Sequence, residues 1–198
     1  MNVYNIDGKL VGFRPLEEKD LNGNWFNWFN DPEVTKYLSR GAIPNTKEQQ
    51  RLFLQNNIAD ATNQIIFAVV DKKSRRHIGV ASIRNIDWVH RNGDIAIIIG
   101  EKDFWRGGYA LEIYYLIVKY SFETLNLHRL VTATIAENKI SLKYCEILGF
   151  KNFGVGKEVF FKSGHYLDCV YSELLENDWK MIQDDSEEKN KQLKKRKK

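Results

Sequence analysis

The chain is poor in cysteine and lacks a long apolar run. Its 198 residues contain two cysteines, Cys145 and Cys169, which are too few for a disulfide framework and have no metal-binding spacing. We therefore expect no metal and a reducing, cytoplasmic setting. The opening residues MNVYNIDGKL lack a basic segment followed by an apolar one, so no signal peptide is predicted. No apolar stretch approaches the roughly 18 residues that cross a bilayer, which argues against a membrane partner.

Charge is unevenly spread along the chain. The formal net charge is +4, but residues 184–198 alone carry seven Lys/Arg and four Asp/Glu, a net of +3. That segment has one apolar residue in fifteen and cannot offset its ordering entropy by burial, so we predict a solvated tail. Residues 1–183 are nearly neutral and long enough for one domain. This argues against a nucleic-acid-binding module, although contact of the basic tail with nucleic acid or the ribosome stays open.

One stretch predicts a strand, a glycine turn and a buried helix in succession. The run from Ile95 to Ile99, β-branched except for Ala96, is typical of a strand buried on both faces. Gly107 and Gly108 then precede a segment that is apolar almost all round and too long for a strand. Two glycines at a helix N-terminus let an anion approach unpaired N–H groups at the positive end of the helix dipole. The turn therefore indicates a phosphate site, although it matches neither G-x-x-x-x-G-K-[ST] nor G-x-G-x-x-G.

The other segments complete an α/β pattern. Helices are predicted at 17–30, 32–38 and 46–59, and strands at 10–15, 64–70, 77–88, 128–135 and around the turn at 163–164. The first helix carries four aromatic residues, which we expect in the core, with the lining of a substrate groove as the alternative. The strand at 128–135 follows a crossover helix, so it should lie parallel to the strand that ends at Gly100.

Two short motifs resemble those of the GNAT acetyltransferase superfamily. The glycine turn is similar to the pyrophosphate loop of that superfamily, Q/R-x-x-G-x-G/A, and reads Trp105, Arg106, Gly107, Gly108, Tyr109, Ala110. Trp at the first position is usual in the branch that contains the ribosomal-protein N-terminal acetyltransferases. A second motif matches one helix and one strand further on, at Asn138, Ser141, Cys145, Gly149 and Phe150.

The resemblance implies a fold and a co-substrate. The fold would be a mixed sheet of about seven strands, splayed in the middle, with helices on both faces, in a single domain. The co-substrate would be acetyl-CoA, whose pyrophosphate would bind the backbone of Arg106, Gly107, Gly108, Tyr109 and Ala110. Its pantetheine arm would extend the sheet by strand addition beside Ile97, Ile98 and Ile99. The acetyl group would pass directly to a primary amine, with no covalent enzyme intermediate.

Proton transfer is the step at which this sequence departs from the superfamily. Many members have Tyr at the position of Cys145, and a buried Cys here is expected to be inert. Ser141 lies four residues earlier on the same helix face, so it is both a cofactor contact and the candidate proton donor. Asn138 would bind the end of the pantetheine arm. Asp94 stands where the branch often has Glu and is the candidate base, with capping of the preceding turn as the alternative.

The amine acceptor is the least determined part of the prediction. The branch favours a protein N-terminus, such as that of a ribosomal protein. An amino-sugar nucleotide is the runner-up, because the segment FNDPEVTKYL resembles the start of enzymes that acetylate such sugars, and polyamines and aminoglycosides are further alternatives. The missing Tyr also leaves open an inactive acyl-CoA-binding or scaffold protein. A homodimer is left open as well.

Overall fold

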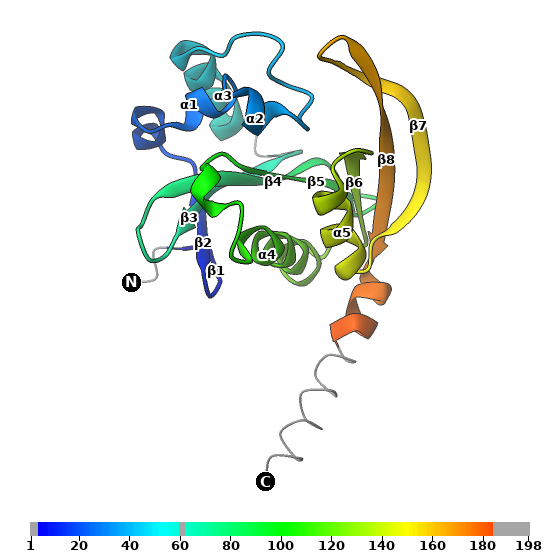
Figure 1. The fold of residues 1–198 in the computed structure, drawn as a ribbon. Coiled ribbons are helices and arrows are strands. Elements are labelled where there is room, and N and C mark those ends of the chain that lie inside the picture. The colour runs from blue at the N-terminus through cyan, green and yellow to red at the C-terminus, as the bar shows by residue number, and fades with distance from the viewer. Residues whose placement is uncertain (1–3, 60–61, 184–198) are drawn as a thin grey trace.

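A computed structural model describes residues 4–59 and 62–183, and their strands form one mixed sheet. Within these residues the sheet has eight strands in the order β1-β2-β3-β4-β5-β6-β8-β7, and only β5 and β6 are parallel neighbours (Figure 1). The predicted mixed sheet is confirmed, with one strand more than expected because the short β1 extends its edge. The strands are β1 (Ile6–Asp7), β2 (Val11–Pro15), β3 (Ile65–Asp71), β4 (His77–Asp87), β5 (Asn92–Ile99), β6 (Arg129–Ile135), β7 (Lys151–Lys162) and β8 (His165–Leu175).

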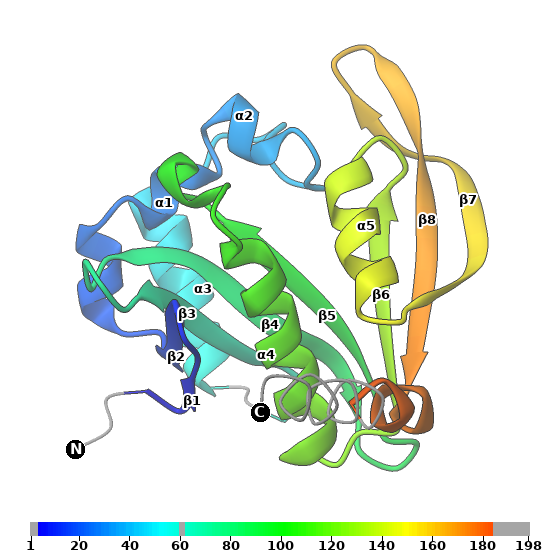
Figure 2. The same ribbon diagram turned by 60° about the horizontal axis from the view of Figure 1, so that its bottom comes forward.

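The parallel pair in the middle of the sheet separates after a few residues. β5 and β6 are paired only over Asn92 to Asp94, opposite Arg129 to Val131. β5 then continues to Ile99 beside β4, while β6 continues beside β8, so the two halves of the sheet diverge (Figure 2). The predicted splay is present, and it leaves the end of β5 without a second neighbour among the described strands.

Helices cover both faces of the sheet, as predicted (Figure 1). One face carries the 3-10 helix η1 (Glu18–Asn22), α1 (Trp25–Trp28), α2 (Pro32–Thr35) and α3 (Lys47–Ala59). The other face carries α4 (Tyr109–Glu123), which packs against β2, β4 and β5, and α5 (Lys139–Ile147), which packs against α4. The short 3-10 helix η2 (Lys102–Phe104) leads into α4, and residues 176–183 are also helical.

The single helix expected at 17–30 is wrong, because the segment forms two short helices, η1 and α1. The carboxylate of Asp20 turns inward, where it accepts hydrogen bonds from Arg14 Nη2 at 2.6 Å and from the Glu17 N–H at 2.8 Å. Gly23 then takes an extended conformation, with φ −87° and ψ −159°, which a continuous helix does not allow. The buried ion pair therefore overrides the helical pattern of the sequence.

Side-chain caps begin the next two helices. Asp31 accepts a hydrogen bond from the Glu33 N–H at 2.9 Å at the start of α2. Thr46 and Gln49 form a reciprocal capping box before α3, with bonds of 2.8 and 3.1 Å. These caps depend on residues two or three positions apart, so the sequence alone can specify them.

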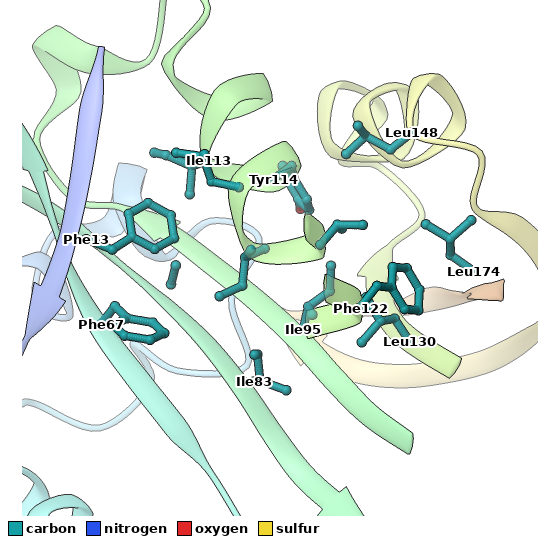
Figure 3. Close-up of a cluster of buried hydrophobic side chains, with 14 of the residues drawn as sticks. Phe13, Phe67, Ile83, Ile95, Ile113, Tyr114, Phe122, Leu130, Leu148 and Leu174 are labelled. Atoms are coloured by element: carbon teal, nitrogen blue, oxygen red, sulfur yellow. The ribbon is translucent and has the colours of Figure 1, made fainter. Parts of the chain in front are cut away.

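Two hydrophobic clusters lie on opposite faces of the sheet. Figure 3 shows the larger one, which includes Ile113 and Tyr114 of α4 together with Phe13, Phe67 and Ile95 of the strands. The smaller cluster lies under α1 and α3 and buries three of the four aromatic residues of the first helical segment, Trp25, Trp28 and Phe29. The predicted core role thus holds for these three, whereas Phe26 is only half-buried, and Phe29 also lines a groove on this face.

The hairpin of β7 and β8 extends beyond the rest of the sheet (Figure 1). Near its turn, Lys162 donates hydrogen bonds to the carbonyls of Thr35 at 2.7 Å and Arg40 at 2.8 Å. The hairpin is thereby tied to the loop after α2, across the diverging strands β5 and β6. None of the described helices is both long and apolar enough to span a membrane. The predicted tail at 184–198 lies outside the described residues.

Candidate functional site

The glycine turn before α4 has the backbone geometry of an anion site. Gly107 and Gly108 have φ of +80° and +87°, and Gly108 is the N-cap of α4. The helix ladder starts where the Glu112 N–H donates to the Gly108 carbonyl at 3.1 Å, so the earlier amides of the first turn have no intrahelical partner. A Cβ at Gly108 would meet only Leu10 Cδ1, at 4.0 Å. The amides are therefore open to a ligand and lie at the positive end of the helix dipole.

Side chains around the turn hold it in place. Tyr109 donates a hydrogen bond to Asp71 Oδ1 at 3.0 Å, and its ring packs edge-on against Phe104. Burial and the neighbouring Asp71 raise the pKa of Tyr109. Glu112 accepts the Leu10 N–H at 2.8 Å, so its carboxylate is engaged by the backbone just before β2. Arg106 is exposed beside the glycines and can add positive charge. Of the residues predicted here, Tyr109 and Ala110 can offer backbone amides, whereas the Tyr109 side chain is structural.

The open edge of β5 carries backbone groups that no strand uses. The Gly100 N–H bonds to the Ile78 carbonyl of the β4 segment at 2.9 Å. Because backbone groups alternate sides along a strand, Ile98 also faces β4, whereas Ile97 and Ile99 face the gap toward β6. The Ile99 carbonyl accepts a hydrogen bond from Trp105 Nε1 at 2.8 Å. The Ile97 amide and carbonyl and the Ile99 amide are the groups placed for strand addition.

A cavity of about 490 Å³ lies between this edge and α5. It is roofed by residues 33–38 around the end of α2 and reaches Trp105 and Ala110 next to the glycine turn. Its walls are mostly apolar. Six of the ten predicted cofactor residues line it, namely Ile97, Ile98, Ile99, Ala110, Asn138 and Ser141. The other four, Arg106, Gly107, Gly108 and Tyr109, belong to the glycine turn and do not line it.

Two hydroxyl groups form a hydrogen bond at the wall of this cavity. Tyr114 of α4 and Ser141 of α5 approach to 2.6 Å between their oxygens, and both residues line the cavity. Asn138 caps α5, since its side-chain oxygen accepts the Ser141 N–H at 3.2 Å. The sequence prediction named Ser141 and Asn138 but missed Tyr114. The two partners are 27 positions apart, and no local pattern links them.

Cys145 lies below the cavity wall. It is 2% exposed, belongs to the larger hydrophobic cluster and is not among the residues that line the cavity. Burial raises the pKa of its thiol to about 11. These features agree with the inert role predicted from the sequence.

Asp94 is separated from the Ser141 side of the cavity. It is the last β5 residue paired with β6, and its carboxylate accepts a hydrogen bond from Asn85 Nδ2 at 2.7 Å. It shares a strand face with Ala96 and Ile98, toward α1 and α3. The two candidate catalytic residues, Asp94 and Ser141, are therefore not brought into one constellation.

A second groove opens on the face of α1 and α3. It consists of pockets of about 210 and 320 Å³ that share four lining residues, Phe29, Arg40, Gln50 and Phe53. Ile98 lines both the smaller pocket and the 490 Å³ cavity, so the groove and the cavity meet at the open end of β5. The guanidinium of Arg40 lies over Phe29 and Phe53, at 5.6 and 5.4 Å from the ring centres. Arg84 also lines the groove, and none of its lining residues, all of them described, is Asp or Glu.

The described part of the chain offers no group of three or more His, Cys, Asp or Glu placed to hold a metal ion. The backbone amides, open strand edge and apolar cavity of this site instead suit a long, partly anionic co-substrate. Amides at a helix N-terminus suit a pyrophosphate, an open strand edge suits an amide-containing arm, and an apolar cavity suits the end of that arm.

Comparison with known proteins agrees with this geometry. Residues 11–151 match the family described as Acetyltransferase (GNAT) domain. The spermidine N(1)-acetyltransferase of Vibrio cholerae is 29% identical over 164 residues, which cover 83% of this chain and 92% of that protein. The [ribosomal protein uS5]-alanine N-acetyltransferase of Escherichia coli is 27% identical over 135 residues, 66% of this chain and 68% of that protein.

A solved structure has the same fold. The crystal structure of spermidine N-acetyltransferase from Vibrio cholerae in complex with CoA and spermine has a TM-score of 0.79 and 24% sequence identity, and the match covers 87% of this chain and 99% of that chain. At this identity the likeness supports the fold of the chain and leaves its acceptor to be argued from the site.

Proposed function

Because this chain belongs to the GNAT acetyltransferase family and is an acetyl-CoA-dependent N-acetyltransferase, we propose that it passes the acetyl group directly to the primary amine of a peptide N-terminus. The observation that carries the proposal is the open end of β5. It lies beside the glycine turn, and there the apolar cavity on one face meets the groove on the other. Donor and acceptor can therefore meet there in one ternary complex.

The donor is held by backbone groups. The amides from Arg106 to Ala110 bind the pyrophosphate, with added charge from the Arg106 side chain. The pantetheine arm lies along β5 and bonds to Ile97 and Ile99, while Asn138 stands at its end. A free N–H at the open edge polarises the thioester carbonyl and stabilises the oxyanion that forms during attack.

The attacking nitrogen must be neutral, which favours an α-amino group. A lysine-like amine with a pKa near 10.4 is about 0.04% neutral at pH 7, whereas an α-amino group with a pKa near 7.8 is about a tenth neutral. A modest base therefore suffices for a peptide N-terminus. Asp94 takes this role through water, since it lies on the acceptor face of β5 and is only partly buried.

The groove on the face of α1 and α3, here called the acceptor groove, is positively charged. This charge favours a peptide over a polycation as the acceptor. Arg40 and Arg84 line the groove without a carboxylate among the lining residues. A polyamine carries two or more positive charges and would meet like charge there, whereas peptide carbonyls and carboxylates can accept hydrogen bonds from both guanidinium groups. An amino-sugar nucleotide also carries anionic groups, so it remains the alternative acceptor.

The test is release of coenzyme A thiol from acetyl-CoA with four acceptors: an acidic N-terminal peptide, the same peptide with its carboxylates amidated, an amino-sugar nucleotide and spermidine. We expect the acidic peptide to have the highest kcat/KM. Arg40→Gln and Arg84→Gln should lower that value, whereas Arg51→Gln on the outer side of α3 should not. A preference for spermidine would refute the peptide acceptor, and no release with any amine would refute the transfer itself.

We further propose that the enzyme acts in the cytoplasm, where acetyl-CoA and nascent peptides occur together. Both cysteines are buried and unpaired, as suits a reducing compartment. Contact of residues 184–198 with the ribosome and assembly into a homodimer stay open alternatives. Gel filtration and sedimentation with ribosomes test them.

A further inference from the structure

Where many superfamily members have a proton-donating Tyr, this chain has Cys145, whose thiol cannot reach the reacting sulfur. Cys145 is buried in the core, lines no part of the 490 Å³ cavity and has a raised pKa. The proton that the departing thiolate needs must then come from another group near the open end of β5. Ser141 by itself is a poor proton donor, because an aliphatic hydroxyl is a very weak acid.

Tyr114 brings a phenol to this position from the neighbouring helix. Its side chain projects from α4 within the buried cluster shown in Figure 3, and it is 8% exposed. It also lines the cavity. Its hydroxyl lies 2.6 Å from Ser141 Oγ, and its ring lies 6.2 Å from the ring of Tyr144. These contacts fix the direction of the hydroxyl. Burial, and to a lesser degree the neighbouring Cys145 thiol, raise the pKa of Tyr114, so the phenol keeps its proton at neutral pH.

The small side chain at Cys145 leaves room for the large ring of Tyr114. Both belong to the same buried cluster, and they are close enough for the thiol to affect the hydroxyl electrostatically. A tyrosine at position 145 would have to compete with the Tyr114 ring for this space, since cores are packed to high density. Tyr114 thus places a phenol from α4 in the buried cluster that also holds Cys145 of α5.

We propose that Tyr114, oriented by Ser141, is the catalytic acid that protonates the coenzyme A thiolate. The inference rests on the proposed acetyl transfer. In the reaction, the amine nitrogen bonds to the carbonyl carbon, and the C–S bond breaks with its electron pair on sulfur. The phenolic proton passes to sulfur, and the surplus proton on nitrogen leaves to solvent. Tyr114 regains a proton from solvent water through the Ser141 hydroxyl, so charge and atoms balance over one turnover.

The decisive variant is Tyr114→Phe, which removes one oxygen and keeps the ring. We expect kcat to fall by about 10²-fold or more, the range of a proton-transfer partner, while the affinity for coenzyme A measured by calorimetry changes less than about threefold. The wild-type kcat should fall in D₂O, and this isotope effect should disappear in Tyr114→Phe, which a purely structural role would not cause. Ser141→Ala should reduce kcat less, because it keeps the acid, and water can take the place of the hydroxyl that orients Tyr114 and returns its proton.

Tyr115→Phe is the matched control, since this adjacent tyrosine faces Gln183 at 3.4 Å and lies outside the cavity lining. It should retain wild-type kcat. A folded Tyr114→Phe protein with kcat within about threefold of wild type and an unchanged isotope effect would overturn the assignment while acetyl transfer stands. A hundredfold loss in Cys145→Ser would transfer the role to that thiol. Absence of thiol release by the wild-type chain with every amine would overturn the proposed function and this inference together.

Discussion

Replacing Gly108 by valine should separate coenzyme A binding from folding. Gly108 has a φ of +87°, and a β-branched residue in the left-handed region costs roughly 1–2 kcal/mol. For a domain of this size each kcal/mol lowers the thermal midpoint by about 2–4 °C, so we expect a drop of about 2–8 °C. The new side chain has room within the protein, because the nearest atom to its Cβ lies at 4.0 Å. The fold should therefore persist at 15 °C.

The effect on the ligand should be larger than this strain. The valine methyl groups would stand where the pyrophosphate approaches the first amides of α4. Loss of one charge-assisted hydrogen bond costs about 1.5–3 kcal/mol, which corresponds to roughly a ten- to hundredfold weaker affinity for coenzyme A. Isothermal titration calorimetry of the folded protein at 15 °C measures this directly.

Gly164→Val is the matched control for this experiment. Gly164 has a φ of +86° in the turn between β7 and β8, and a Cβ added there would meet no atom within 4 Å. It should lose a similar amount of stability and keep full affinity for coenzyme A. If Gly108→Val binds coenzyme A within threefold of wild type, or if both variants lose affinity equally, the glycine turn is not the pyrophosphate site.

Substitutions at three further positions and one truncation test other parts of the reasoning. Cys145→Ser should keep more than about a tenth of wild-type activity, because an inert thiol contributes no proton-transfer factor; Cys145→Tyr should lower the thermal midpoint, since the Tyr114 ring already fills that region, and a stable, active variant would contradict this packing. Asp94→Asn should lower kcat more at pH 6 than at pH 9 if Asp94 acts as a base, and an equal loss at both values would make it a turn cap. Burial would raise the pKa of Asp20, but hydrogen bonds from Arg14 and His77 outweigh it and hold that pKa below its ordinary value; its stabilisation is thus complete above about pH 4 and is lost as the pH falls further. Denaturant unfolding of Asp20→Asn should show a loss of about 3–5 kcal/mol at pH 7 that shrinks toward pH 3, and a constant loss would refute the linkage. Truncation after Asp184 should leave the thermal midpoint and the rate on a short peptide unchanged, and a loss confined to ribosome-bound acceptors would assign the tail to that partner.

Most of the fold follows from local patterns in the sequence. The run at Ile95 to Ile99 and the apolar segment after Gly108 specify β5 and α4, because strand and helix periods act over a few residues. The cap at Asp31 and the cap at Asn138 are specified in the same way, by side chains that bond to backbone groups two or three positions ahead. The glycine turn could be predicted as a phosphate site because its two glycines directly precede a helix in the sequence.

Other features depend on residues that are distant in the sequence. The break between η1 and α1 follows from Asp20, which turns toward Arg14 on a neighbouring strand instead of continuing a helix. The groove on the face of α1 and α3 combines Arg40 from a loop with Arg84 from β4, and its charge cannot be predicted from either segment alone.

The proton donor shows the limit of sequence reasoning most clearly. The sequence shows that position 145 holds Cys where many superfamily members have Tyr. It does not show which other residue donates the proton. Tyr114 resembled one more apolar residue of a buried helix until the packing of α4 on α5 brought its hydroxyl to Ser141. The direction of a buried side chain is set by the neighbours that fill the space around it, and those neighbours come from every part of the chain.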